Sequence, residues 1–380
     1  MFNFGRENTG YVAKWWRNVD KQILFSFLFF FLLGLFFSFS STSSVIAEKV
    51  NKETYFFFLK HLIFVLISFI FLTAISIQSK EIIIKLIVPF FILSVFFLFL
   101  VPFIGVEVKG SRRWLDLFFL PRFQPVELIK PFFILIVAKI IVIKDKNIYL
   151  KHLSSLLILS FILILLINQP DLGQSLLLSA SWLIMIFVSG FNMIVLTIIG
   201  IFFLLILAVL IYFLPSKFSY VFSRIQTFLN PQSGDNFQSQ KAIDAIKAGG
   251  LTGQGMGEGI LKDRVPEAHT DYIIAVISEE FGTLFVLFIA ILFLFIGYKV
   301  LIKVFYEQDE FVKLALVGLI SLIIMQAFIH MGVNTRLLPT TGMTLPFLSY
   351  GGSSLIGTSI IVGIILNFTR KDVSRNYRNE

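Results

Sequence analysis

Three ionisable side chains stand directly before a long apolar run in the stretch PEAHTDYIIAVISEEFG, residues 266–282. They are Glu267, His269 and Asp271. A carboxylate in this position could accept a proton as a general base. It could also be an ordinary acid in the first turn of a helix, where the helix dipole stabilises it by roughly 0.3–1 kcal/mol. The residue types alone leave both interpretations of Asp271 open.

Two further carboxylates, Glu279 and Glu280, lie inside the same apolar run. A charged side chain within a membrane span is costly, so it is expected to face the protein interior or a wet cavity. We therefore expect one of the two to form an ion pair with Lys130 or Lys139 on another span. Such a pair could line a site or serve the structure alone.

Two segments between apolar runs, both expected on the outer side of the membrane, carry basic side chains. Residues 105–125 include Arg112 and Arg113, and residues 214–271 include six further Lys and Arg. Basic residues are usually kept on the cytoplasmic side of a membrane. Cations on the outer side therefore indicate an anionic ligand near the lipid head groups, and binding of ordinary anionic lipids is the alternative.

The composition indicates an integral membrane protein. Of the 380 residues, 57% are hydrophobic and 14% are charged, whereas soluble domains carry about 25% charged residues. The chain has no cysteine, which excludes thiolate chemistry, and its four histidines are scattered, which argues against a histidine-built metal site. We expect no resident metal, although a divalent cation such as Mg²⁺ or Mn²⁺ could bridge Asp271 and a phosphate group.

The apolar runs predict an all-α membrane domain at 23–367 with about ten transmembrane helices, because roughly 20 apolar residues cross the core of a bilayer. The expected spans are 23–45, 60–78, 82–104, 126–143, 153–168, 173–189, 191–213, 272–297, 313–334 and 350–367. One large extracytoplasmic loop, 214–271, should connect the seventh and eighth spans. The basic residues of segments 1–22 and 368–380 place both ends in the cytoplasm.

Glycine and proline interrupt the chain beside the expected outer helix ends. The run GGLTGQGMGEG at 249–259 has neither the spacing of a dinucleotide-binding fingerprint nor the lysine of a P-loop. We interpret it as a segment whose backbone can approach a ligand, or as a merely flexible loop. The breaks at 332–348 and 349–354 could likewise be ordinary turns.

Four stretches together resemble the SEDS family (shape, elongation, division and sporulation). They are GSRRWLDL with FQPVELIK at 110–130, NQPDLGQSLLL at 168–178, GGLTGQGMGEGILKDRVPEAHTDYIIAVISEEFG at 249–282 and LLPTTGMTLPFLSYGGSSL at 337–355. The forms KWWRNVDKQ and TTGMTLPFLSYGGSS look more like the division branch, FtsW, than the elongation branch, RodA. The chain departs from the usual family pattern at Val126, Gln174 and Arg336.

The resemblance implies a peptidoglycan glycosyltransferase that polymerises lipid II into glycan strands. In that chemistry Asp271 would be the catalytic base that takes the proton of the acceptor's 4-hydroxyl group, and undecaprenyl pyrophosphate would leave the donor with inversion. The implied substrate-binding residues are Arg112, Arg113, Gln124, Glu127, Lys130, Asp171, Glu267, His269, Ser349, Gly351 and Gly352. For Asp171, which follows Pro170, ordinary helix capping is the alternative.

The resemblance also implies a location and partners. It points to a multi-pass protein of the bacterial inner (cytoplasmic) membrane at the division septum. Its ligands would be lipid II and the nascent glycan strand. Its protein partners would be a class B penicillin-binding protein, an FtsI-like transpeptidase, and other divisome proteins, and no nucleic acid is expected.

Three other functions stay open on the sequence. A lipid II flippase would also need a cavity, interior charges and a patch for pyrophosphate, and a catalytic Asp271 is what separates a polymerase from it. A RodA-type elongation polymerase would differ in its cellular role. A scaffold that recruits a transpeptidase would need no catalytic residue.

Overall fold

The computed structural model describes residues 10–41, 55–108, 111–117, 121–144, 147–192, 215–230 and 236–371, with short pieces between 194 and 213. Helices make up most of it. They are α1 (Tyr11–Asn18), α2 (Lys21–Ser41), α4 (Phe56–Ile77), α5 (Lys80–Ile104), α6 (Pro125–Ile141), α7 (Ile148–Asn168), α8 (Leu172–Val188), α10 (Pro215–Leu229), α11 (Phe237–Gly249), α12 (Ile273–Tyr306), α13 (Glu310–Asn334) and α14 (Gly352–Phe368). A two-stranded antiparallel sheet joins β1 (Val106–Val108) to β2 (Ser111–Trp114).

Six of the described helices are long and apolar enough to cross a membrane: α2, α4, α5, α7, α12 and α13. Helices α6, α8 and α14 are also apolar but have 17 residues each. All of these helices overlap predicted spans, which confirms the all-α membrane fold. The predicted span 191–213 lies for the most part outside the described residues, so the count of ten stays a prediction.

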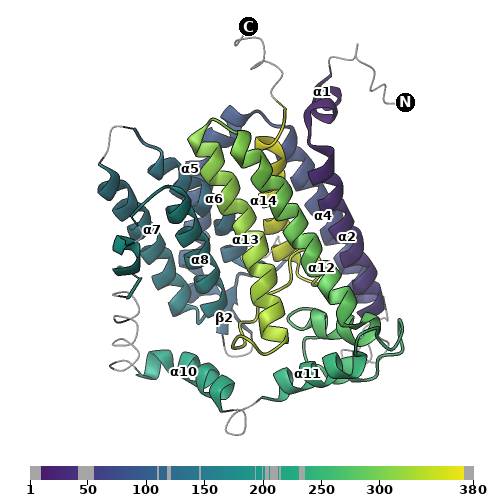
Figure 1. The fold of residues 1–380 in the computed structure, drawn as a ribbon. Coiled ribbons are helices and arrows are strands. Elements are labelled where there is room, and N and C mark those ends of the chain that lie inside the picture. The colour runs from purple at the N-terminus through teal and green to yellow at the C-terminus, as the bar shows by residue number, and fades with distance from the viewer. Residues whose placement is uncertain are drawn as a thin grey trace.

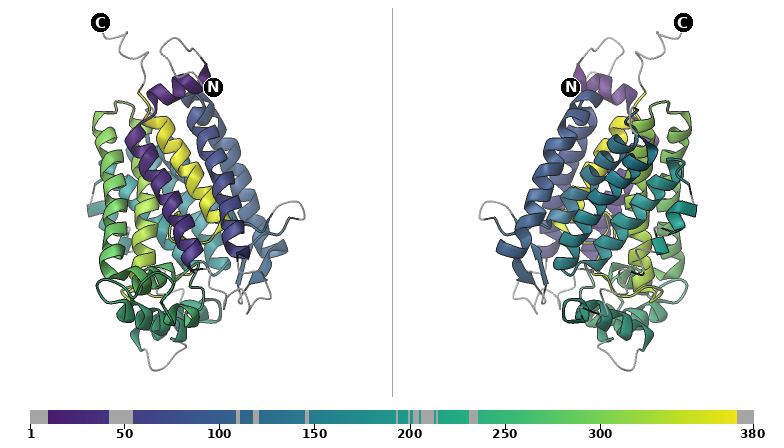
Figure 2. Two further views of the ribbon diagram at one scale, coloured as in Figure 1. Left: turned by 90° about the vertical axis from the view of Figure 1, so that its right-hand side faces the viewer. Right: turned by 90° about the vertical axis from the view of Figure 1, so that its left-hand side faces the viewer.

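Helices α13 and α14 form the centre of a single bundle (Figures 1 and 2). Helix α14 packs against α4 and α6, and α13 packs against α12, α8 and α6. Both central helices are buried along nearly their whole length. Helices α4 and α5 instead expose many large apolar side chains. Helices that face lipid do so, because apolar side chains are compatible with the hydrocarbon of the bilayer.

The two ends of the bundle differ. Helix α1 and the end of α14 lie at one end, while α10, α11 and the β1–β2 sheet lie at the other (Figure 1). The predicted loop 214–271 is therefore partly helical, since it contains α10, α11 and the short 3₁₀ helix η1 (Leu261–Arg264). The segments to which the sequence assigns chemistry gather at this end.

Helix α12 is interrupted at Gly282, whose φ of 83° and ψ of 167° are not helical. The segment 249–255 fills the break. Its backbone amides donate to the carbonyl oxygens of Glu279 (2.9 Å) and Glu280 (3.0 Å), and its carbonyl oxygens accept from the two amides that follow Gly282 (3.0 and 3.2 Å). In an unbroken helix these four groups would bond to one another, so the inserted segment replaces one turn of helical hydrogen bonding.

Close packing explains the glycines of this segment. A Cβ atom on Gly249 would lie 1.9 Å from the carbonyl oxygen of Ser278, and one on Gly253 would lie 2.2 Å from that of Glu280. Both distances are too short for any side chain. At Gly249 and Gly253 glycine therefore allows the backbone to approach α12. For the rest of 249–259 the interpretation as a ligand-approaching or flexible segment stays a prediction.

Candidate functional site

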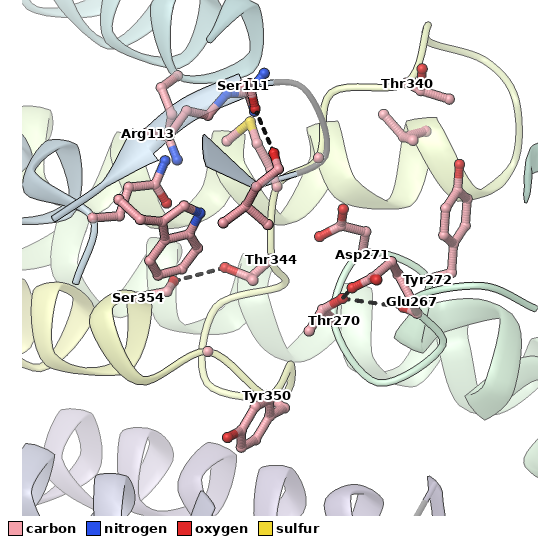
Figure 3. Close-up of a pocket in the computed structure, with 18 of the residues that line it drawn as sticks. Ser111, Arg113, Glu267, Thr270, Asp271, Tyr272, Thr340, Thr344, Tyr350 and Ser354 are labelled. Carbon is pink, nitrogen blue, oxygen red and sulfur yellow. Dashed lines mark hydrogen bonds between the residues drawn. The ribbon is translucent and has the colours of Figure 1, made fainter. Parts of the chain in front are cut away.

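A pocket of about 430 Å³ lies at the end of the bundle that carries α10 and α11 (Figure 3). Its walls come from the β1–β2 sheet, the starts of α6 and α8, helices α10 and α11, the turn before α12 and residues 333–354. Segments far apart in the sequence thus meet around one polar cavity.

Asp271 lies on the wall of this pocket and its carboxylate points into the cavity (Figure 3). It precedes Tyr272, the N-cap residue of α12, and so stands outside the first helical turn. The turn before it is held by hydrogen bonds from the amides of Thr270 (3.0 Å) and Tyr272 (3.2 Å) to the carbonyl oxygen of Glu267. Burial and the adjacent Asp271 carboxylate raise the pKa of the Tyr272 hydroxyl to about 12, so this hydroxyl stays protonated at neutral pH.

Asp271 and Arg113 border the same small space beside Gly342. A Cβ atom built on Gly342 would lie 3.5 Å from Asp271 Oδ2 and 3.8 Å from Arg113 Nη1. A second guanidinium group, that of Arg224, lines the pocket and donates from Nη1 to the carbonyl oxygen of Thr340 at 2.8 Å. A carboxylate that can accept a proton and two cations that can stabilise an anion therefore share one cavity.

Asp171 holds Arg113 from behind the pocket. Arg113 donates to the two carbonyl oxygens that precede Asp171, and its Nη1 lies 3.9 Å from Asp171 Oδ1. The carboxylate also caps α8 by accepting from the amide of Gln174 (3.4 Å) and accepts from Gln124 Nε2 (3.0 Å). Burial raises the pKa of the Asp171 carboxyl, which the charge of Arg113 opposes. Asp171 thus both caps α8 and orients pocket residues.

The floor of the pocket is an ion pair on α6. Glu127 lines the pocket and Lys130 lies beneath it, with 3% and 1% of their surfaces exposed. Lys130 Nζ donates to both carboxylate oxygens of Glu127 (2.8 Å each) and to Gln326 Oε1 (3.0 Å). Gln174 Nε2 donates to Glu127 Oε1 at 3.0 Å. The charge of Lys130 is therefore already compensated by Glu127.

The carboxylates within α12 have different partners from those expected. Glu280 accepts hydrogen bonds from Lys262 Nζ and from the hydroxyl of Ser40. Glu279 accepts from the amide of Leu261 at 2.7 Å. The prediction that Glu279 or Glu280 pairs with Lys130 or Lys139 is wrong, because the connection before α12 folds back onto it and supplies Lys262 and the amide of Leu261 as partners.

Five of the eleven predicted substrate-binding residues line the pocket with Asp271. They are Arg113, Gln124, Glu127, Glu267 and Gly351. The other six, all within the described chain, lie outside its lining. Their roles toward a substrate stay predictions.

Several of those six support the pocket instead. Ser349 Oγ donates to the carbonyl oxygen of Thr270 at 2.6 Å, and the carbonyl oxygen of His269 accepts from the amide of Tyr350 at 2.9 Å. Gly352 packs against the ring of Phe64, where a Cβ atom would approach to 2.5 Å. The loop between α13 and α14 is thus tied to the turn that carries Asp271.

Arg112 lies apart from these residues. Its side chain is half exposed on β2 and pairs with Glu107 at 3.6 Å. The sheet therefore directs Arg113 toward the pocket and its neighbour toward the surroundings, as side chains alternate along a strand.

Sequence reasoning left other pocket residues without a role, among them Ser111, Trp114, Tyr272, Thr344 and Ser354. Thr344 Oγ1 donates to Ser354 Oγ at 2.8 Å across the pocket wall (Figure 3). Both lie within the stretch LLPTTGMTLPFLSYGGSSL, so the motif identified the segment but not which of its side chains face inward.

Comparison with known proteins gives a consistent result. A family model described as a cell cycle protein, FtsW/RodA/SpoVE, matches residues 20–374. A probable peptidoglycan glycosyltransferase FtsW of Caulobacter vibrioides is 34% identical over 378 residues, which cover 97% of this chain and 93% of that protein. The corresponding protein of Geobacter sulfurreducens is 36% identical over 345 residues, which cover 87% and 90%.

The fold is similar to two solved structures. One comes from a peptidoglycan synthase complex that coordinates polymerization and crosslinking, with a TM-score of 0.74, 24% identity, and coverage of 92% of this chain and 97% of that chain. The other is the Thermus thermophilus rod shape determining protein RodA, with a TM-score of 0.67, 24% identity, and coverage of 92% and 96%. The resemblance noted in the sequence is confirmed, and this chain belongs to the FtsW/RodA/SpoVE family.

Proposed function

We propose that this protein is a peptidoglycan glycosyltransferase that polymerises lipid II during septal wall synthesis. Its relatives at 34–36% identity carry the name of that activity. The observation that carries the proposal is that Asp271 Oδ2 and Arg113 Nη1 border the same space beside Gly342, 3.5 and 3.8 Å from the position of a Cβ atom there. This arrangement brings a proton acceptor and a cation to one point of a cavity that opens toward the polar end of the bundle.

The reaction uses the two kinds of group in different ways. Asp271 accepts the proton of the acceptor's sugar hydroxyl as the oxygen attacks the anomeric carbon of the donor. The bond from that carbon to undecaprenyl pyrophosphate breaks, and the pyrophosphate carries the negative charge away. Arg113 and Arg224 are the cations best placed for this charge, because both line the pocket and charge-assisted hydrogen bonds to phosphate are strong.

Lys130 has another role in this proposal. Since its ammonium group is shared between Glu127 and Gln326, it stabilises the floor rather than the leaving group. Arg112 lies at the exposed edge of the sheet, where it can attract a phosphate before the phosphate enters the pocket.

The turn before α12 offers two carboxylates, those of Asp271 and Glu267, that would hold a divalent cation in this pocket. Asp271 and Glu267 both line the cavity, and Mg²⁺ commonly takes one or two carboxylates together with substrate phosphates. The described residues contain no group of three or more acidic or histidine side chains arranged for a metal. Such an ion would add positive charge for the pyrophosphate.

A flippase is less well supported than a polymerase. The polar floor ends at Lys130, and the next buried side chains of α6 include Phe133, Ile134 and Val137. An apolar wall below the pocket favours a reaction at one face of the membrane over passage of a charged head group, because burying that group without polar partners is costly.

The proposal includes a location and partners. The pocket lies on the extracytoplasmic side of the bacterial cytoplasmic membrane, both termini lie in the cytoplasm, and the protein works at the septum. Its protein partners are a class B penicillin-binding protein, which crosslinks the glycan strand, and other division proteins. The similar chain within a peptidoglycan synthase complex supports this pairing.

The test is glycan synthesis in detergent micelles, where no bilayer has to be crossed. Purified protein with its cognate transpeptidase and lipid II should yield polymer, and Arg113→Ala should lower the yield while Arg122→Ala, a change in an exposed ion pair with Asp116, should not. Substrate binding without polymer from the wild type would instead support a flippase or a scaffold.

A further inference from the structure

The first segment of α12 is a separately anchored unit. It runs from Ile273 to the break at Gly282, and Asp271 immediately precedes it. Because helical hydrogen bonding is interrupted at Gly282, the long remainder of α12 does not by itself fix this segment. The segment 249–255 holds its far end, so its near end, where Asp271 lies, needs an anchor of its own.

Asn334, the last residue of α13, is that anchor. It is 1% exposed. Its Oδ1 accepts from the amide of Ala275 at 3.3 Å, and its Nδ2 donates to the carbonyl oxygens of Asp271 (3.0 Å) and His330 (2.9 Å). An amide donor on one side and two carbonyl acceptors on the other fix which end of the Asn334 side chain is oxygen and which is nitrogen.

These contacts amount to a helix cap supplied by another helix. The amide of Ala275 belongs to the first turn of α12 and is shared between the carbonyl oxygen of Tyr272 (3.0 Å) and Asn334 Oδ1 (3.3 Å). In the described structure the N-cap residue, Tyr272, does not cap this turn with its side chain. A cap residue normally provides the acceptor from its own side chain. Here Asn334 provides it across the interface between α12 and α13.

The same amide controls the direction of Asp271. Its Nδ2 fixes the carbonyl of Asp271, while Ser349 Oγ fixes the carbonyl of Thr270 at 2.6 Å. Two consecutive peptide groups are thus held from outside the turn, and the Asp271 side chain leaves the backbone from the Cα atom between them. Asn334 is outside the pocket lining, which its neighbour Val333 reaches, so it acts through Asp271.

We propose that Asn334 is a positioning residue for the Asp271 base. The proposal rests on the proposed function, since it concerns the geometry of that base. It also predicts an effect that is independent of activity: without Asn334 the backbone of residues 270–277 loses two hydrogen bonds and becomes less stable.

Two substitutions test the contacts of Asn334. Asn334→Ala removes both contacts, whereas Asn334→Asp keeps an acceptor for the amide of Ala275 and loses the donor to Asp271. We expect Asn334→Ala to lower kcat by about 10- to 100-fold with a much smaller change in KM, as small displacements of a reacting group do. Asn334→Asp should recover neither kcat nor thermal stability, because a carboxylate oxygen would face the carbonyl oxygens of Asp271 and His330 in a buried site.

Asn367 provides the matched control. It is also a buried asparagine near the end of a central helix, and its Nδ2 donates to the carbonyl oxygens of Ile75, Ser76 and Gln78 at the opposite end of the bundle. Asn367→Ala should lower thermal stability and leave the kcat of the folded protein unchanged. An equal loss of kcat in both alanine variants, or recovery of kcat in Asn334→Asp, would overturn the proposal.

Hydrogen exchange gives a readout that needs no substrate. The amides of residues 270–277 should exchange faster in Asn334→Ala than in the wild type or in Asn367→Ala. Unchanged exchange there would overturn the proposal even if activity fell. If the wild type itself forms no glycan, the proposed function fails, and the exchange data still decide whether Asn334 holds this segment.

Discussion

Removal of Lys130 is the sharpest test of the buried floor. Lys130→Met takes away two charged hydrogen bonds of 2.8 Å from the Glu127 carboxylate. Glu127 is 3% exposed, so little of its surface is open to water, and the hydrogen bond from Gln174 does not balance the charge. Leaving one member of a buried ion pair without the other costs about 3–5 kcal/mol, and we expect the free energy of unfolding to fall by that amount.

Equilibrium unfolding in mixed micelles, followed by tryptophan fluorescence, measures this loss. The double variant Glu127→Met/Lys130→Met removes both charges and should recover most of the stability, because a buried pair replaced by apolar side chains is often neutral. Lys303→Met serves as the control. Lys303 pairs with Asp20 at 2.7 Å, but its side chain is 34% exposed, so about 1 kcal/mol or less should be lost.

Two results would refute this reasoning. One is a loss below about 1 kcal/mol for Lys130→Met, the value typical of exposed pairs. The other is a double variant that is no more stable than the single one. Either would mean that the floor is hydrated and that Glu127 and Lys130 are available to a substrate as free charges.

Two other substitutions test the pocket and its support. Gly342→Ala should lower kcat at least about tenfold, because its methyl group would occupy the space bordered by Asp271 Oδ2 (3.5 Å) and Arg113 Nη1 (3.8 Å) and keep the reacting groups of the substrate out of it. Gly190→Ala is the control for backbone strain, because Gly190 has a similar positive φ (77°, against 70° at Gly342) and no described atom lies within 4 Å of the added Cβ. An equal loss of kcat in both variants would refute the steric argument. Lys262→Met leaves Glu280 buried without its cation, so the free energy of unfolding should fall by about 3–5 kcal/mol. The double variant Lys262→Met/Glu280→Gln should recover part of this loss. A double variant no more stable than Lys262→Met would contradict a direct pairing of Lys262 with Glu280.

The membrane helices could be predicted because a span must be about 20 apolar residues long, whatever its neighbours are. Helix α12 shows where this argument stops. Its predicted end at 297 marks the end of the apolar run, but the helix continues to Tyr306. The last turns contain Lys299 and Lys303, and a helix can extend beyond the membrane once its backbone is hydrogen-bonded internally.

Side-chain partners could not be predicted in the same way. The partner of Glu280 is Lys262, 18 residues earlier in the chain, and the segment 249–255 that fills the break at Gly282 belongs to the same returning connection. A single glycine within an apolar run is compatible with an unbroken helix. The hydropathy pattern therefore led to the expectation that Glu280 pairs with a lysine on another span, and it gave no sign of the connection before α12 that supplies Lys262.

The candidate site was predicted in part. The acidic turn and the basic strand carry sequence signals, since charges beside apolar spans are unusual, and these signals led to Asp271 and Arg113. Thr344 and Ser354 carry no such signal, because small polar residues are common in turns. Which residues of the α13–α14 loop face the pocket depends on hydrogen bonds between distant segments, such as that from Ser349 to Thr270.

The central claim is that Asp271 is the base of a lipid II polymerase. The most direct measurement is the rate of glycan formation from purified lipid II by the purified protein with its cognate transpeptidase, for the wild type and for Asp271→Asn, with thermal unfolding to establish that both are folded. The asparagine keeps the size of the side chain and cannot accept the proton, so the rate should fall by about 10²- to 10⁴-fold. Polymer formation by Asp271→Asn at the wild-type rate would contradict the claim.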